Sequence, residues 1–159
     1  MLLSLDTVCQ SAAQFTIWGD HAMATEDYYG ASRFYAEALQ QEGGRMELQW
    51  RYAEACRLSN QYPQAAETYE KVFRKDQGRT HPEALHRLGE MQLCSGQYGF
   101  AQKTWQKVEQ KQKDSTSFLG QRARNALEGI RMALASIPID TILIEHLPEP
   151  VNSYDSEFA

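Results

Sequence analysis

The chain has 159 residues, enough for one domain of ordinary size. It has 16 Lys and Arg residues and 21 Asp and Glu residues, so its net charge is −5. An acidic chain of this kind is not expected to bind nucleic acid, because neutralising phosphates requires a basic face. The hydrophobic content of 42% is that of a globular domain, and no apolar run is long enough to span a membrane as a helix.

Residues 1–13 are rich in leucine at the start and in small residues before Gln14. This composition is similar to the second half of a secretory signal peptide, although the charged front part is missing and Asp6 interrupts the apolar stretch. The alternative is a frayed or disordered N-terminal arm. Both interpretations stay open at this point, and the first would place the protein outside the cytoplasm.

The next hundred residues contain a repeated pattern. An aromatic residue is followed by alanine three positions later, by a second aromatic four positions after that, and then by a small or β-branched residue. The three copies are Tyr28, Ala31, Tyr35 and Ala38; Tyr62, Ala65, Tyr69 and Val72; and Tyr98, Ala101, Trp105 and Val108. Small residues precede each copy at Gly19, Ala53 and Gly89, and both sets are spaced by 34 and then 36 residues.

This spacing predicts pairs of antiparallel helices. A small residue on the first helix and an alanine on the second let the two backbones approach, and the aromatic side chain fills the space beside the crossing. The pairs Glu26-Asp27, Asn60-Gln61 and Gly96-Gln97 are suited to the turns between the helices. Thr80, close to Pro82, is expected to cap the first helix of the third pair.

A single helix is predicted after the third pair, at residues 116–135. Its apolar residues recur at helical spacing, and the polar residues of its outer face are Arg122, Arg124, Asn125 and Arg131. The apolar residues are Leu119, Ala123, Ala126, Leu127, Ile130 and Leu134. Pro138 follows, so we expect a capping helix that covers the last pair. From Ser136 onward the chain is extended in character, and residues 136–159 are expected to be a tail or linker that leads toward an absent domain.

The 34-residue helix–turn–helix unit resembles the tetratricopeptide repeat (TPR), and the third unit matches this family best. The proline that commonly closes such a repeat is missing, and two extra residues precede the third unit. The resemblance implies an all-α, right-handed solenoid in a domain spanning residues 14–135. The repeats are expected at about 14–44, 45–78 and 80–113, with the capping helix at 116–135.

The segment Val151–Ala159 is similar to the lead-in of WD40-like β-propellers, which follow TPR segments in cell-envelope proteins of Bacteroidetes. Those proteins usually carry an OmpA-like peptidoglycan-binding domain, and one belongs to the type IX secretion apparatus. The resemblance implies a periplasmic or outer-membrane-associated scaffold that would reach peptidoglycan only through domains absent from this chain. The alternative is a cytoplasmic TPR adaptor or co-chaperone.

No pattern in the sequence predicts catalysis. There is no phosphate-binding loop, no nucleophile elbow and no pair of histidines at metal-ligand spacing. Cys56 and Cys94 are expected to be buried, inert thiols. We therefore expect no enzyme activity, no cofactor and no metal.

The TPR resemblance implies a concave partner-binding surface on the first helix of each unit. Carrying over the family's positions gives Asp20, Glu47, Trp50, Glu54, Arg57, Glu83, His86, Glu90 and Arg124, with Thr16, Met23 and Leu93 beside them. This set is mainly acidic. TPR domains that grip a C-terminal carboxylate have lysine and asparagine where this chain has Asp20, Trp50, Glu54 and Glu90, so that mode is not expected.

The hypothesis is therefore a protein segment, extended or helical, whose basic groups face the glutamates and whose apolar residue lies on an exposed Trp50. The alternative is that Trp50 packs against the neighbouring helix and the charges are solvated.

Overall fold

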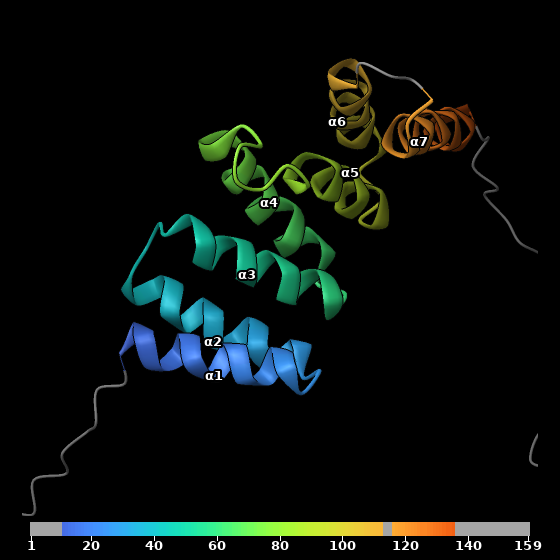
Figure 1. Cartoon of the computed structure of the whole chain (residues 1–159). Coiled ribbons are helices and arrows are strands. Elements are labelled where there is room, and N and C mark those ends of the chain that lie inside the picture. The colour runs from blue at the N-terminus through green and yellow to red at the C-terminus, as the bar shows by residue number, and fades with distance from the viewer. Residues whose placement is uncertain (1–10, 113–115, 136–159) are drawn as a thin grey trace, which may run out of the picture.

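A computed structural model describes residues 11–112 and 116–135 of the chain, which form seven α-helices and no strand (Figure 1). The expected all-α solenoid is confirmed. The predictions for residues 1–10 and 136–159 lie outside the described residues. The helices are α1 (Ala12–Ala24), α2 (Tyr28–Gln41), α3 (Met46–Leu58), α4 (Tyr62–Asp76), α5 (Ala84–Cys94), α6 (Tyr98–Lys111) and α7 (Phe118–Ala135).

The first helix begins two residues earlier than the predicted start at Gln14, because Ser11 caps it. The Ser11 hydroxyl accepts a hydrogen bond from the Gln14 backbone N–H at 3.3 Å. Asp27 does the same for α2, where its carboxylate accepts from the Gly30 N–H at 2.9 Å.

The predicted cap at Thr80 is wrong. With Thr80 as the cap, α5 would begin at residue 81. It begins three residues later, at Ala84, and Glu83 is its cap residue. The backbone N–H groups of Thr80 and His81 instead donate to the carboxylate of Asp76, at 2.7 and 2.9 Å. Asp76 thus fixes the longer loop that the two extra residues create before the third unit.

The three turns inside the helix pairs lie at the predicted residues, and all three have the same geometry. Glu26, Asn60 and Gly96 each have a positive φ, of 62°, 61° and 69°. In each turn the N–H of the next residue donates to the carbonyl oxygen five positions earlier, at 2.8–2.9 Å. This is the hydrogen bond of a Schellman motif, and its recurrence gives the three pairs a common crossing geometry.

Small residues lie at the helix crossings, as expected. A Cβ atom added to Gly19 in α1 would lie 2.5 Å from the Tyr35 ring of α2. One added to Gly89 in α5 would lie 2.8 Å from the Trp105 ring of α6. Both distances are too short for real atoms, so glycine is what lets each aromatic ring lie against its partner helix.

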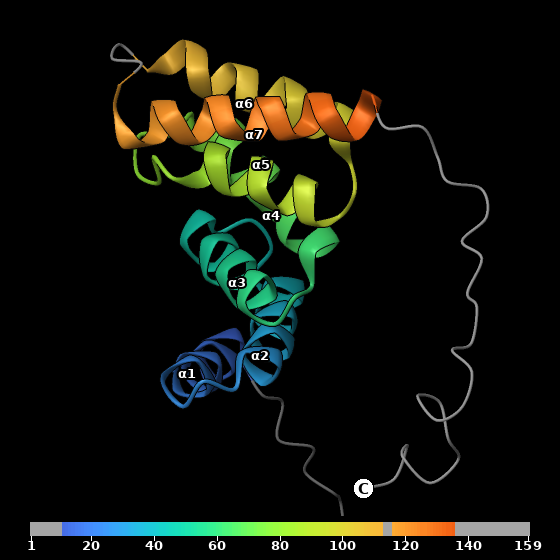
Figure 2. The same ribbon diagram turned by 90° about the vertical axis from the view of Figure 1, so that its right-hand side faces the viewer.

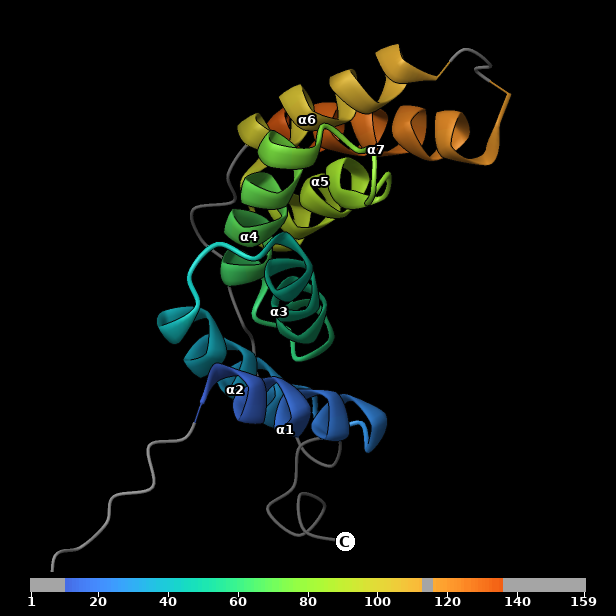
Figure 3. The ribbon, with the colours of Figure 1, turned by 60° about the vertical axis from the view of Figure 1, so that its left-hand side comes forward.

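The helices stack in chain order, and each packs mainly on its neighbours along the sequence (Figures 1 and 2). The first helices of the pairs, α1, α3 and α5, follow one side of the stack, and α2 and α4 follow the other (Figure 3). We name α1, α3, α5 and α7 the A helices and α2, α4 and α6 the B helices. The side on which the A helices meet is the A-helix surface, where the candidate site lies.

The capping helix α7 lies against α6 and buries Ala123 and Ile130. Leu134, predicted on its packing face, is 55% exposed. The reason is length, because α7 has 18 residues and α6 only 14, so the last turn extends past its neighbour. Among the described residues, no helix has the length and hydropathy that a membrane span requires.

Candidate functional site

The nine predicted site residues lie on the A helices or at the start of α5, but they do not form one continuous acidic surface. Most of them are held in two groups of ion pairs that run from helix to helix. The first group joins α1 to α3, and the second joins α3 to α5 and α7. The other four, which are Trp50, Glu83, His86 and Arg124, lie outside both groups.

The first group is centred on Arg51. Its guanidinium binds both carboxylate oxygens of Asp20 at 2.8 Å and one oxygen of Glu47 at 3.2 Å. Asp20 also accepts a hydrogen bond from the Tyr35 hydroxyl at 2.7 Å. The other oxygen of Glu47 lies 3.5 Å from Nε2 of His81. Arg51 therefore fixes α3 against α1, and Glu47 connects α3 to the loop before α5.

Trp50 is half-buried, so the expectation of an exposed tryptophan is wrong. Its ring stacks on His81 with centroids 4.3 Å apart and planes 14° from parallel. Its edge meets the Tyr69 ring at 5.4 Å. His81 lies in the longer loop before α5. Its side chain is buried, and its imidazole lies on the Trp50 indole. Trp50 thus packs against neighbouring parts of the stack, as the alternative interpretation proposed, and keeps only part of its surface for a partner.

Glu54 is the best-held carboxylate of the set, with a side chain that is only 19% exposed. Arg57 donates to it at 2.6 Å, the Tyr69 hydroxyl also donates to it, and Arg87 of α5 lies 4.0 Å away. Burial alone would raise the pKa of Glu54. The hydrogen bonds from Arg57 and Tyr69 and the two arginine charges outweigh burial and hold the pKa below its ordinary value.

Glu90 on α5 is held in a similar way. Its side chain is 13% exposed, and its oxygens lie 3.3 Å from Arg87 on the same helix and 2.6 Å from Arg122 on α7. Arg122 was predicted on the outer face of the capping helix. Pairing with Glu90 brings its guanidinium to the A-helix surface instead, where it connects the capping helix to the third unit.

The remaining predicted residues are less constrained. Glu83 and Arg124 are exposed, and neither forms an ion pair within residues 11–112 and 116–135. His86 is half-buried, and burial lowers the pKa of its imidazole below the ordinary value of 6.5.

Sequence reasoning missed four members of these groups, namely Arg51, Arg87, Arg122 and His81. Two signals were available, since Glu47 and Arg51 are four apart and Arg87 and Glu90 are three apart, spacings that pair on a helix surface. Nothing local indicates that Arg122 or His81 would reach another helix. With these arginines included, the two groups hold four carboxylates and four guanidinium groups, so the surface is charge-compensated rather than mainly acidic.

The two described cysteines differ. Cys56 is buried, and burial raises the pKa of its thiol to about 11. Cys94, expected to be buried, is exposed, because it is the last residue of α5. Both are free thiols. Within the described part of the chain, no three His, Cys, Asp or Glu side chains are grouped as a metal site would require.

Comparisons with known proteins agree with this fold. Residues 22–89, which run from α1 into α5, match a family model described as tetratricopeptide repeat. No curated protein sequence matches the chain.

Solved structures match over most of the length. The Sgt2 TPR domain from Aspergillus fumigatus has a TM-score of 0.59 and 20% identity, and the match covers 88% of this chain and 92% of that one. The first TPR domain of Spaghetti (RPAP3), bound to the HSP90 peptide SRMEEVD, has a TM-score of 0.57 and 20% identity. That match covers 80% of this chain and 95% of the other. The helix pairs and these matches agree: the chain has the fold of a tetratricopeptide-repeat solenoid, and residues 22–89 match the family model itself.

Proposed function

We propose that this chain is a non-catalytic protein-interaction module that binds a segment of a partner protein on the A-helix surface. The observation that carries the proposal is the set of charged side chains held in fixed positions across four successive A helices. Because ion pairs already orient these side chains, a partner does not have to order them, and less entropy is lost on binding. The similar RPAP3 TPR domain, with its bound HSP90 peptide, supports peptide binding as the mode.

The arrangement of exposed charges indicates the chemistry of the partner. Glu54 and Glu90 already accept from arginines, so a purely basic segment would gain little from them. The most exposed charges of the two ion-pair groups are Asp20 and Glu47 at the α1–α3 end of the surface and Arg122 at the α7 end. We therefore propose a segment of mixed charge, with a basic residue near Glu47 and an acidic residue near Arg122, which also fixes its direction.

An adaptor role is better supported than an envelope role. One similar structure is a TPR domain with a bound peptide, and neither similar structure is described as an envelope protein. The periplasmic and type IX secretion context depends on the resemblance of Val151–Ala159, which lies outside the described residues, and on the composition of residues 1–13, and no comparison supports it. We therefore propose an adaptor or co-chaperone, and the location in the cell stays a proposal.

The test captures the partner and then measures its affinity. A photo-crosslinking amino acid at Glu47, in the full chain expressed in its own cell, should capture a partner segment. The same probe at Gln64, exposed on α4, should not. Glu47 is 57% exposed and Arg122 is 46% exposed, so a partner segment can reach both side chains.

The variants Glu47→Lys and Arg122→Glu should each weaken binding of the captured segment about tenfold, which corresponds to about 1.4 kcal/mol. The control Glu67→Lys, an exposed charge on α4, should bind as the wild type does. Affinities within twofold of the wild type for both surface variants would reject the A-helix surface as the binding site.

A further inference from the structure

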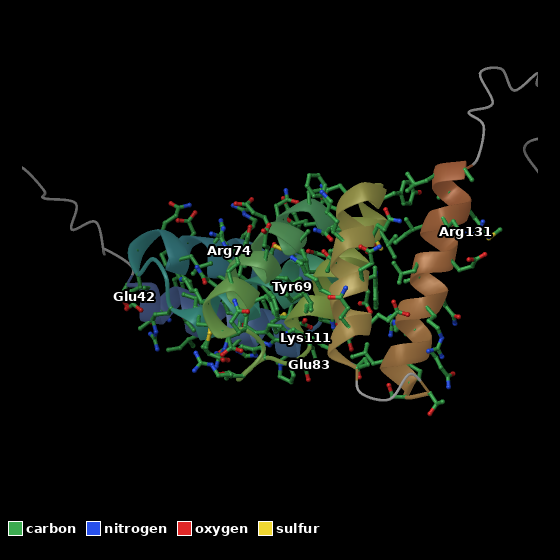
Figure 4. All side chains as sticks on the ribbon, turned by 90° about the horizontal axis from the view of Figure 1, so that it is seen from above. Glu42, Tyr69, Arg74, Glu83, Lys111 and Arg131 are labelled. Carbon is green, nitrogen blue, oxygen red and sulfur yellow. The ribbon has the colours of Figure 1, made fainter. Side chains whose placement is uncertain are left out.

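A second surface, on the opposite side of the stack, carries basic side chains that form no ion pair within the described residues. A groove of about 380 Å³ lies between the B helices α4 and α6, with α5 beneath it. Leu88 and Phe73 contribute apolar side chains to its lining, and Phe100, also lining it, is 63% exposed. Lys111 of α6 lies 4.9 Å above the Phe73 ring of α4 and joins the two helices there. Figure 4 labels Lys111 together with Arg74 of α4.

The charged residues that line this groove are mainly basic. Arg74 on α4 and Lys103 and Lys107 on α6 line it, and Glu70 is the one acidic residue beside them among the described residues. None of the three cations is in an ion pair within the described ranges. On the A-helix surface, by contrast, arginines and carboxylates neutralise one another. The α4–α6 groove therefore favours an occupant that is acidic and partly apolar.

The chain contains such an occupant. Residues 136–159 include five acidic residues and no Lys or Arg: Asp140, Glu145, Glu149, Asp155 and Glu157. Removing these five from the 21 acidic residues of the chain leaves 16, which equals the number of Lys and Arg residues. Residues 1–135 are therefore neutral overall, and residues 136–159 carry the whole net charge of −5. Residues 137–147 also hold four isoleucines and two leucines.

The segment begins at the correct end of the groove. Helices α6 and α7 are antiparallel, so Ala135, the last residue of α7, lies at the end of the hairpin where α6 begins (Figure 2). Phe100 is in the first turn of α6. Asp140 is five residues beyond Ala135 and Glu145 is ten, which allows spans of up to about 17 and 35 Å. From Phe100 to Lys107 the helix rises only about 10 Å.

We propose that residues 136–147 of this chain dock in the α4–α6 groove. Asp140 and Glu145 face Arg74, Lys103 and Lys107, and an isoleucine or leucine lies against Phe100. The proposal concerns a different surface from the partner-binding one, so either can fail without the other. Its consequence is that the segment following the helical domain leaves it along a fixed path on the B-helix side.

Carbodiimide coupling of the full chain tests the proposal, because it joins a lysine amine directly to a carboxylate in contact with it. At low salt and low protein concentration, coupling should join Lys103 or Lys107 to Asp140 or Glu145. Lys71, paired with Glu67 at 2.6 Å, serves as the internal control and should not couple to the segment. Mixing ¹⁵N-labelled and unlabelled chains distinguishes coupling within one chain from coupling between two.

Hydrogen exchange of the amides of 139–147 gives an independent measurement. These amides should exchange about tenfold more slowly in the wild type than in Lys103→Glu/Lys107→Glu, and the difference should shrink in 0.5 M salt. Arg33→Glu/Lys71→Glu, which changes the net charge equally, should keep the protection. Absent or unselective coupling, coupling between chains only, or equal exchange in both double variants would each overturn the proposal.

Discussion

Gly89 in α5 shows how one missing atom determines the crossing of a helix pair. The indole of Trp105 lies where a Cβ atom at this position would be, and its Nε1 is buried without a hydrogen-bond partner among the described residues. Packing alone therefore holds the ring in place. Unit two has Ala53 at the equivalent position, in the same buried cluster as Tyr69, and unit one has Gly19 against the Tyr35 ring. A small residue is thus common to the three crossings, whatever the size of the aromatic ring.

The close contact between Gly89 and the Trp105 ring predicts that Gly89→Ala destabilises the fold. The added methyl group would overlap the Trp105 ring, so we expect the free energy of unfolding to fall by about 1–3 kcal/mol. The control is Gly129→Ala in α7, where nothing lies within 4 Å of the added atom. That variant should gain about 0.5–1 kcal/mol, because alanine favours a helix interior. Urea denaturation of both variants measures the difference, and two gains of similar size would contradict the crossing argument.

The helix crossings could be predicted from the sequence, but the environment of Trp50 could not. The crossing glycines and the aromatics opposite them recur at a fixed period, so their pairing could be predicted. The half-buried state of Trp50 could not, because it depends on His81, which lies in a loop whose path is fixed by a carboxylate at Asp76. Side chains that meet across a non-repeating loop leave no periodic signal.

At the scale of elements, α3 and α5 are joined by partly buried charges rather than by apolar contacts alone. Glu54 is held by Arg57, Arg87 and the Tyr69 hydroxyl. Its pKa is lower in the folded chain than the ordinary 4.5, so it stabilises the fold fully above that value and progressively less as the pH falls below it. His86 also makes the fold less stable at lower pH. Because burial lowers its pKa below 6.5, the unfolded chain takes up a proton first, and stability falls as the pH drops below 6.5.

These shifts predict the behaviour of Glu54→Gln. At pH 7 the variant leaves Arg57 without its carboxylate partner and Arg87 with Glu90 alone, so we expect a loss of about 1–3 kcal/mol. At low pH the wild type also loses the Glu54 charge, so the melting temperatures of the two chains should converge as the pH falls below 4.5. The His86 contribution below pH 6.5 should remain in both. Thermal denaturation followed by circular dichroism from pH 7 to 3 measures this.

A matched control is Glu128→Gln on α7. Glu128 also binds an arginine, Arg131, at 2.6 Å, but both side chains are exposed to solvent. We expect its melting temperature to follow that of the wild type at every pH. An equal loss in the two variants would mean that position within the stack does not matter for these pairs.

The limits of the predicted helices were set by different signals. The recurring spacing and the turn pairs located the helices, and the three turns at Glu26, Asn60 and Gly96 have a common geometry. The start of α5 was missed because threonine before proline is a good local cap signal. In the structure the carboxylate of Asp76, the last residue of the preceding helix, accepts the hydrogen bond of the Thr80 N–H, so the end of α4 determines the path of the loop before α5 begins.

At the scale of the whole molecule, the stack is nearly one-dimensional, since each helix packs mainly on its neighbours along the chain. The buried residues form three successive clusters, centred on α1–α2, on α3–α4 and on α6–α7. In such a stack, stability is close to a sum of units and of the interfaces between them. Damage at one end should therefore stay near that end.

Ile130 in the capping helix provides the test, because it is buried in the last cluster. Ile130→Ala should cost about 2–5 kcal/mol locally. Hydrogen exchange should then accelerate strongly in α7 and α6, less in α5, and not measurably in α1 and α2. Leu134→Ala, in the same helix but largely exposed, should leave all seven profiles unchanged. A uniform acceleration from α1 to α7 in the Ile130 variant would instead show that the domain unfolds as one cooperative unit. The fixed positions of charges across the A-helix surface would then depend on the capping helix as well.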